Sequence, residues 1–175
     1  MSDLRSLAPL LAALVGGPGI MAACGPLDEV GDCVSPCTGD TICIGTTCQP
    51  AFPRTYRVTL GVSLVDRDPD GACWDEPFCG SPDPYAELLV DGLSAGRTNE
   101  SSESFSHRWT DQPFNVMLRA DSRVELVAYD VDVDLNDFAA RCTATPITAS
   151  TLRAGQLRCG VAGESDVYAD FELVE

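Results

Sequence analysis

Four aspartates lie within eight positions of the stretch YDVDVDLNDF (129–138), with no basic residue among them. They are Asp130, Asp132, Asp134 and Asp137. Calcium takes six to eight oxygen ligands in loose geometry, so clustered aspartates suit this ion. The stretch therefore predicts either a calcium-binding loop or a solvated turn on an acidic protein.

A second acidic segment, DRDPDGACWDEP (66–77), opens like the calcium loop of an EF-hand. Its twelfth position is Pro77 instead of the glutamate that this loop requires. Counted from Asp130, the other segment has Leu135 at position six and Arg141 at position twelve. Neither segment is a self-contained site, but a β-sandwich can bring two loops together at one end.

Catalysis and transition-metal binding are not expected. His107 is the only histidine, so it is the only possible histidine base. No nucleophile elbow and no nucleophile–base pair are present. The serines in NESSESFSH (99–107) read as a polar loop that runs into a strand.

The charge balance excludes a nucleic-acid partner. The chain of 175 residues has a formal net charge of −16, and all eleven basic residues are arginine. A nucleic-acid binder needs clustered bases to displace phosphate counterions. Docking to an anionic lipid surface would need a bridging cation.

The N-terminus, residues 1–23, reads as an export signal. Its apolar stretch is interrupted by glycines and prolines, which argues against a spanning helix. It ends in MAAC, which resembles a bacterial lipobox and implies acylation of Cys24. The alternative is an ordinary cleaved signal with Cys24 in a disulfide. Gly25 lacks the aspartate of an inner-membrane retention mark, which favours the outer membrane of a bacterial cell envelope.

Cysteine parity supports the lipid anchor. Nine cysteines are an odd count for an exported chain. Without Cys24, eight remain for four disulfides: Cys33, Cys37, Cys43, Cys48, Cys73, Cys79, Cys142 and Cys159. Residues 24–32 read as a tether, 33–48 as a cysteine-rich mini-module and 49–55 as a linker. Disulfides are favoured over a zinc site in the mini-module, because zinc modules prefer closer cysteine pairs.

The remaining residues, 56–175, predict a β-sandwich. In YRVTLGVSLV (56–65) apolar and polar residues alternate, which is typical of a half-buried strand. Further strands are expected at 85–92, 114–118, 123–129 and 166–174. Polar turns separate them, and no long helical period occurs. We therefore expect an all-β, eight-stranded antiparallel sandwich.

Several motifs of this region resemble the C2 domains of calcium-dependent membrane-binding proteins. SPDPYAELLV (81–90) is similar to the Asp-Pro-Tyr hallmark at the start of a strand, and DPDG (68–71) to the preceding loop. SHRWTDQPFNV (106–116) resembles the tryptophan-bearing strand, without the usual Asn-Pro. VELVAYDVDVDLNDF (124–138) resembles the strand and third loop of that family.

The resemblance implies five calcium ligands, which are Asp68, Asp83, Asp130, Asp132 and Asp137. The third loop is one residue shorter than in the family, so Asp134 could replace Asp137. The first loop carries an insertion, ACWDEPFCG (72–80), so Asp66 or Asp70 could replace Asp68.

The insertion suggests a small ring closed by Cys73 and Cys79. Trp74 and Phe78 lie inside it and could serve as membrane contacts, since aromatic side chains suit the headgroup boundary. The alternative is that they pack on the disulfide or the sandwich. Cys142 and Cys159 fit a second, structural crosslink.

Together these features predict an exported, lipid-anchored calcium-binding module, not an enzyme. Its acidic loops would dock a membrane phospholipid or a protein partner. The alternative is a calcium-independent structural or adhesive β-sandwich lipoprotein, because charge runs are often solvated surfaces.

Overall fold

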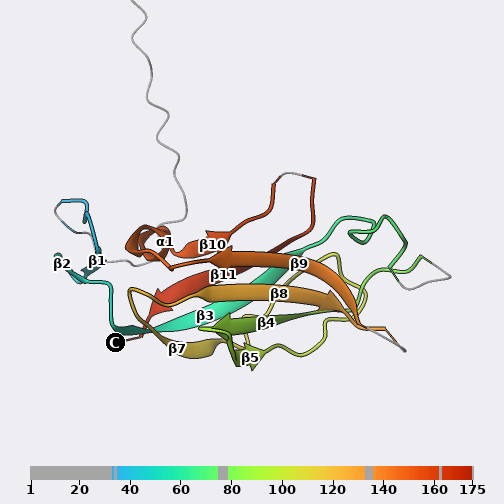
Figure 1. Cartoon of the computed structure of the whole chain (residues 1–175), viewed down its shortest axis with the longest axis horizontal. Coiled ribbons are helices and arrows are strands. Elements are labelled where there is room, and N and C mark those ends of the chain that lie inside the picture. The colour runs from blue at the N-terminus through green and yellow to red at the C-terminus, as the bar shows by residue number, and fades with distance from the viewer. Residues whose placement is uncertain (1–32, 34, 75–78, 133–135, 162, 175) are drawn as a thin grey trace, which may run out of the picture.

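A computed structural model describes residues 33, 35–74, 79–132, 136–161 and 163–174. Two antiparallel sheets form a sandwich, as the alternating sequence predicts (Figure 1). One sheet has the order β10 (Gln156–Arg158), β11 (Asp166–Leu173), β3 (Arg54–Ser63) and β6 (Ser106–Arg108), with β7 (Phe114–Leu118) also paired to β3. The other has the order β5 (Leu93–Arg97), β4 (Pro84–Val90), β8 (Val124–Asp130) and β9 (Asp137–Ala144).

Strands β6 and β7 share one edge of the first sheet. β6 pairs with residues 61–63 of β3, and β7 pairs with residues 54–58 of the same strand. The described part of the two sheets therefore holds nine strands, one more than expected, because β6 and β7 divide one edge of β3 between them.

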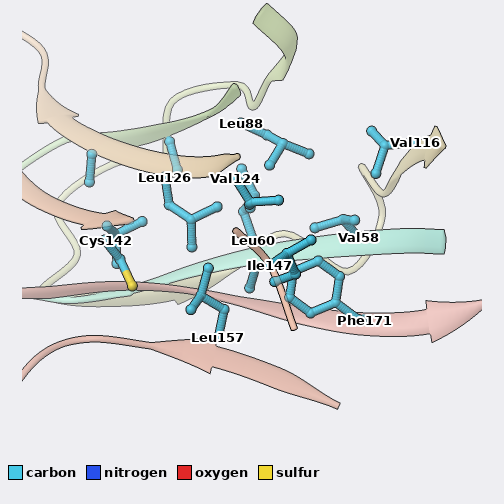
Figure 2. Packing of buried hydrophobic residues seen from close by; sticks show 14 of the residues in the cluster. Val58, Leu60, Leu88, Val116, Val124, Leu126, Cys142, Ile147, Leu157 and Phe171 are labelled. Atoms are coloured by element: carbon cyan, nitrogen blue, oxygen red, sulfur yellow. The ribbon is translucent and has the colours of Figure 1, made fainter. Parts of the chain in front are cut away.

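The core lies between the two sheets and follows the period-two pattern. Val58, Leu60 and Val62 of β3 are fully buried, and Val167 and Ala169 of β11 face the same core. Figure 2 shows these layers meeting, with Leu60 of one sheet near Leu126 and Val124 of the other. Burial of such apolar side chains supplies most of the driving force for folding.

A hairpin of β1 (Thr41–Ile44) and β2 (Thr47–Pro50) precedes the sandwich. Two disulfides crosslink it, Cys33–Cys43 and Cys37–Cys48. Cys33, Cys37 and Cys48 form the only group of three potential metal ligands that lie close together in the described residues. Their sulfurs are in disulfides, which removes the zinc alternative. Residues 49–55 contain the end of β2 and the start of β3, and Ala51 between them is fully buried.

Helix α1 (Ala149–Ala154) joins β9 to β10 and packs beside the hairpin. Thr148 caps its first turn, and Gly155 ends it in the left-handed conformation with φ 69°. Within the described residues no helix is long and apolar enough to cross a membrane.

Candidate metal site at the acidic loops

Strand pairing brings three of the predicted ligands together. Asp130 ends β8, and its register partners are Pro84 on β4 and Asp137 on β9. Asp83 directly precedes Pro84, and its backbone N–H donates to Oδ1 of Asp130 over 2.6 Å. The carbonyl of Asp83 accepts from the N–H of Val131. The neighbouring ends of these strands therefore carry Asp83, Asp130 and Asp137 at one end of the sheet.

The three carboxylates differ in exposure. Asp130 is fully buried, whereas Asp83 is half-buried and Asp137 is exposed. A buried carboxylate costs free energy unless hydrogen bonds or a cation compensate its charge. Among the described residues, no arginine forms an ion pair with Asp83, Asp137 or Asp68.

Asp68 lies in the first loop and holds that loop in a turn. Its Oδ1 accepts the N–H of Ala72 over 2.7 Å, and its carbonyl accepts the N–H of Gly71. Gly71 has φ 83°, a conformation that suits glycine. One oxygen of Asp68 is therefore committed to its own loop, and Asp66 and Asp70 beside it are exposed.

The segment 98–105 forms hydrogen bonds with Asp83 and with the preceding residue. The N–H of Glu103 donates to Oδ1 of Asp83, and the N–H of Ser104 donates to the carbonyl of Pro82. Glu103 itself has a positive φ of 49°. Sequence reasoning missed this role, because backbone hydrogen bonds leave no pattern in side-chain types.

The predicted ligands do not form a closed cage. In the part of the chain that the structure describes, no three carboxylates have ligand atoms within 4.8 Å of one another. Asp132 is half-buried one residue beyond Val131, and Asp134 lies outside the described residues. The donor set has the oxygen chemistry of a calcium site, and an ion would have to draw the loops together.

The prediction that Trp74 contacts a membrane is wrong in this structure. Trp74 is 1% exposed and belongs to the hydrophobic core, and its indole N–H donates to the carbonyl of Val65 over 2.8 Å. The ring closed by the Cys73–Cys79 disulfide is present as expected. Trp74 therefore packs into the core, as the alternative interpretation expected. Burying a large aromatic side chain is more favourable than leaving it exposed to solvent. Phe78 lies outside the described residues.

The remaining disulfide joins Cys142 of β9 to Cys159 after β10. The predicted pairing is confirmed, and it links the two sheets at the side of β9. All eight cysteines among the described residues are paired.

Exposed apolar side chains do occur at the acidic end, at positions that sequence reasoning missed. Phe105 is 37% exposed just before β6, and Phe138 is 45% exposed next to Asp137. Phe105 is tied to the first loop, since its carbonyl accepts the N–H of Leu64. Figure 1 shows the first loop and the end of β8 at the same end of the sandwich.

Comparison with known proteins identifies the fold. A solved structure described as a C2 domain superposes with a TM-score of 0.51, covering 70% of this chain and 99% of that chain at 16% identity. The fold is C2-like. A structure of two C2 domains of Extended-Synaptotagmin 2 superposes with a TM-score of 0.50 at 16% identity, covering 71% of this chain and 43% of that one. No protein-family model and no curated protein matches the sequence.

The C2-like sandwich accounts for the positions of the motifs. The Asp-Pro-Tyr motif lies where β4 begins, and the acidic stretch 129–138 spans the end of β8 and the start of β9. Trp109 follows β6 and is 1% exposed. At such low identity the likeness concerns the fold alone, so ligand and partner are argued from the residues.

Proposed function

We propose that this protein is an exported lipoprotein whose C2-like sandwich binds calcium and docks a phospholipid surface through its acidic loops. One observation carries the proposal: Asp83, Asp130 and Asp137 lie on adjacent ends of β4, β8 and β9. Asp68 and Asp132 would complete the ligand set from the two flanking loops.

The chemistry of the donors favours calcium over other ions. Carboxylate oxygens suit calcium, whereas zinc prefers the nitrogen and sulfur ligands that are lacking here. Because the carboxylates are not gathered within one cage, we expect weak binding in the range of extracellular calcium modules, about 0.1–1 mM.

Calcium would also make lipid docking possible. With a net charge of −16, the protein is repelled by anionic headgroups unless a cation bridges them. Phe105 and Phe138 could then contact the apolar boundary beside the ion, in place of Trp74.

Export and anchoring have separate support. Four disulfides are typical of an oxidising compartment. They use every cysteine except Cys24, which is left for acylation. The proposed location is the bacterial cell envelope, and Gly25, which is not the aspartate of an inner-membrane retention mark, favours the outer membrane. Labelling with a fatty acid that is abolished by Cys24→Ser would support this assignment, and label that survives the substitution would oppose it.

A calcium-independent structural or adhesive role is the second candidate. One carboxylate oxygen of Asp68 and one of Asp83 accept backbone N–H groups, of Ala72 and Glu103 respectively. On this alternative the aspartates serve only to order their loops.

Thermal unfolding with calcium and with chelator separates the two candidates. An ion that binds only the native state raises the free energy of unfolding, by about 2.7 kcal/mol at a concentration of 100 Kd. We expect Asp130→Asn to abolish this rise, since asparagine can still accept the N–H of Asp83 but carries no charge. The matched control is Asp40→Asn, which makes the same charge change in the exposed turn that precedes β1. An unchanged melting temperature in calcium at 100 times the expected Kd, about 10–100 mM, would falsify the calcium proposal.

A further inference from the structure

Strand β7 forms an open edge of the first sheet. It pairs with β3 at five consecutive positions without a register shift. Within the part of the chain that the structure describes, no strand pairs with the other side of β7. Figure 1 shows β7 at the lower margin of the sandwich, beside β5.

The pairing of β3 shows which backbone groups of β7 point outward. The carbonyl of Thr55 accepts the N–H of Val174, so the backbone groups of Thr55 point to the β11 side of β3 and not to β7. The register partner of Thr55 on β7 is Met117. Directly opposite residues of an antiparallel pair exchange either both hydrogen bonds or none, so the N–H and C=O of Met117 point away from the sheet. The same holds for Asn115, two residues earlier.

The β7 edge lacks the features that usually keep edge strands apart. Its sequence, FNVML, contains no charge and no proline, and its pairing contains no bulge. Met117 is 60% exposed, and Leu93 of the adjoining strand β5 is 75% exposed. The ring of Phe114 packs directly on Gly96 of β5, so the two strands meet along this side of the sandwich. An open, uncharged edge beside exposed apolar side chains is typical of a surface that another strand covers.

The other edge strands of the described sandwich are protected. β5 is bulged at Ala95, which has no register partner between Ser94 and Gly96. β9 exposes the charged side chains of Asp137 and Arg141. β6 and β10 have three residues each, which is too short for a stable new ladder. The open edge of β7 is therefore a specific feature among the described strands.

Strand β7 is complementary to a second copy of itself. In an antiparallel pair with a two-fold axis at Val116, Asn115 of each copy lies opposite Met117 of the other. Because both residues direct their N–H and C=O outward, each of these two pairs exchanges two hydrogen bonds, which gives four in total. A two-fold contact of this kind closes on itself and leaves no edge open for a third copy.

Charge permits this pairing despite the net charge of −16. In the same register, Arg119 of one copy lies beside Pro113 of the other, next to the turn that carries Asp111. Opposite charges therefore approach each other at both ends of the strand pair. Arg57, which is paired in register with Asn115, is already neutralised by Glu172 over 3.3 Å. The acidic loops lie at the other end of β3, and physiological salt screens charges beyond about 8 Å.

We propose that β7 of one copy pairs with β7 of a second copy, so that the two first sheets join into one antiparallel sheet across a two-fold axis. The interface is independent of calcium, because it lies on the half of β3 remote from the acidic loops. One strand pair and a few apolar side chains are at the low end of protein interfaces, below about 1,200 Å². We therefore expect a weak, reversible dimer at micromolar protein concentration.

Cysteine cross-linking tests the register. Asn115→Cys and Met117→Cys are made separately in the full chain, each with Cys24→Ser so that only one free thiol is present. Under mild oxidation, a mixture of the two variants should form disulfide-linked dimers about tenfold faster than either variant alone. Opposed Cα atoms of a hydrogen-bonded pair lie about 5.5 Å apart, within disulfide range. A single variant places its two cysteines diagonally, about 7–8 Å apart, which is too far.

A charged edge provides the matched control. Sedimentation of the full chain with Cys24→Ser, over a series of concentrations, should show dimers that chelator leaves unchanged. Met117→Lys should weaken association by about tenfold, because a lysine on an edge strand opposes pairing. Val161→Lys makes the same charge change at a side chain that is also 60% exposed, in the loop after β10, and should leave association unchanged. Thermal unfolding checks that both variants are folded.

Every other outcome overturns the β7 pair. Monomers at all concentrations, with no cross-link in the mixture, show that this edge does not meet a second copy and leave an extended peptide of another protein as its occupant. Equal cross-linking in the mixture and in the single variants contradicts the two-fold register. Equal losses from Met117→Lys and Val161→Lys indicate non-specific apolar association, and dissociation by chelator indicates contact through the acidic loops. The calcium response in thermal unfolding is measured separately, so the proposed function stands or falls independently of this dimer.

Discussion

The two ends of this sandwich order their loops in different ways. At the hairpin end, two disulfides and the Arg153 guanidinium hold the chain, and the acceptors of the Arg153 hydrogen bonds are backbone carbonyls. At the acidic end, the acceptors are the carboxylates of Asp68, Asp83 and Asp130, and the donors are backbone N–H groups. The difference teaches that one carboxylate group can serve both loop ordering and ion binding. A carboxylate has two oxygens, so one can order a loop while the other faces an ion.

Trp74 is the exception at the acidic end, because it anchors the first loop by burial instead of by a carboxylate. We expect Trp74→Ala to lower the free energy of unfolding by about 3–5 kcal/mol, the usual cost of deleting a large buried aromatic. Denaturant unfolding followed by circular dichroism measures the loss. Trp74→Phe is the companion variant, which should keep most of the burial and lose only the hydrogen bond to Val65.

The calcium response of Trp74→Phe tests whether the buried Trp74 side chain also positions the proposed calcium ligands. If the carboxylates alone order the acidic end, this variant should keep the calcium-induced rise in melting temperature. Loss of that rise in a folded Trp74→Phe protein would show that the core anchor also sets the positions of the ligands.

The disulfide within the sandwich and a disulfide of the hairpin should differ in how much of the protein each one stabilises. Replacing Cys142 and Cys159 together by alanine opens a crosslink of sequence separation 17 between sandwich segments. The global free energy of unfolding should fall by about 3 kcal/mol. Replacing Cys33 and Cys43 should instead expose the hairpin amides to hydrogen exchange and change the sandwich transition less. An equal loss in the global free energy of unfolding from both double replacements would contradict this expectation.

The sequence predicts the sandwich well because apolar and polar residues alternate along β3. Residues 56–65 carry four apolar side chains on one face, and all four are buried. The edge strand β5 was missed, since its polar residues and exposed Leu93 carry no such alternation. β10 was missed because three residues are too few for a periodic pattern.

Only part of the candidate site could be predicted from the sequence. Asp130 stands out in the acidic stretch 129–138, whereas Asp83 was singled out only by the resemblance of SPDPY to a C2 motif. The register of β4 and β8 explains why the two residues meet. The inward direction of Trp74 depends on the space left at the end of the core, which no local pattern encodes. The bracing of Asp83 by Glu103 depends on a backbone N–H, which every residue except proline carries.

Arg153 tests how firmly the hairpin end is held. Arg153→Met keeps the apolar stem but removes two charge-assisted hydrogen bonds, one of them partly buried. We expect a loss of about 1–2 kcal/mol, because such bonds are worth more than neutral ones but are partly solvated. Hydrogen exchange at the Ile42 and Ile44 amides should accelerate. Arg119→Met, which removes an exposed guanidinium after β7, should not change it.

Tyr56 gives the smallest expected effect, which is seen only at high pH. Burial raises the pKa of Tyr56 to about 12, and the nearby charge of Arg54 offsets part of this rise. The folded state therefore favours the neutral phenol, whose contribution is complete below pH 10 and is lost as the pH rises towards 12. Unfolding measured rapidly across this window should show a steeper loss of stability for the unmodified protein than for Tyr56→Phe. Parallel curves would contradict the assignment, since Tyr168, whose pKa burial also raises, remains in both proteins.

The position of β3 has a mechanical consequence. Its neighbour β11 pairs with it at eight consecutive positions, and β6 and β7 cover its other edge. A pulling force between the hairpin and the acidic loops would run along this strand, so it would load the flanking hydrogen bonds in shear and all at once. Antiparallel ladders that are sheared must break together, whereas ladders that are peeled from one end open one bond at a time. The strand that connects the two ends is thus the one best placed to carry tension between them.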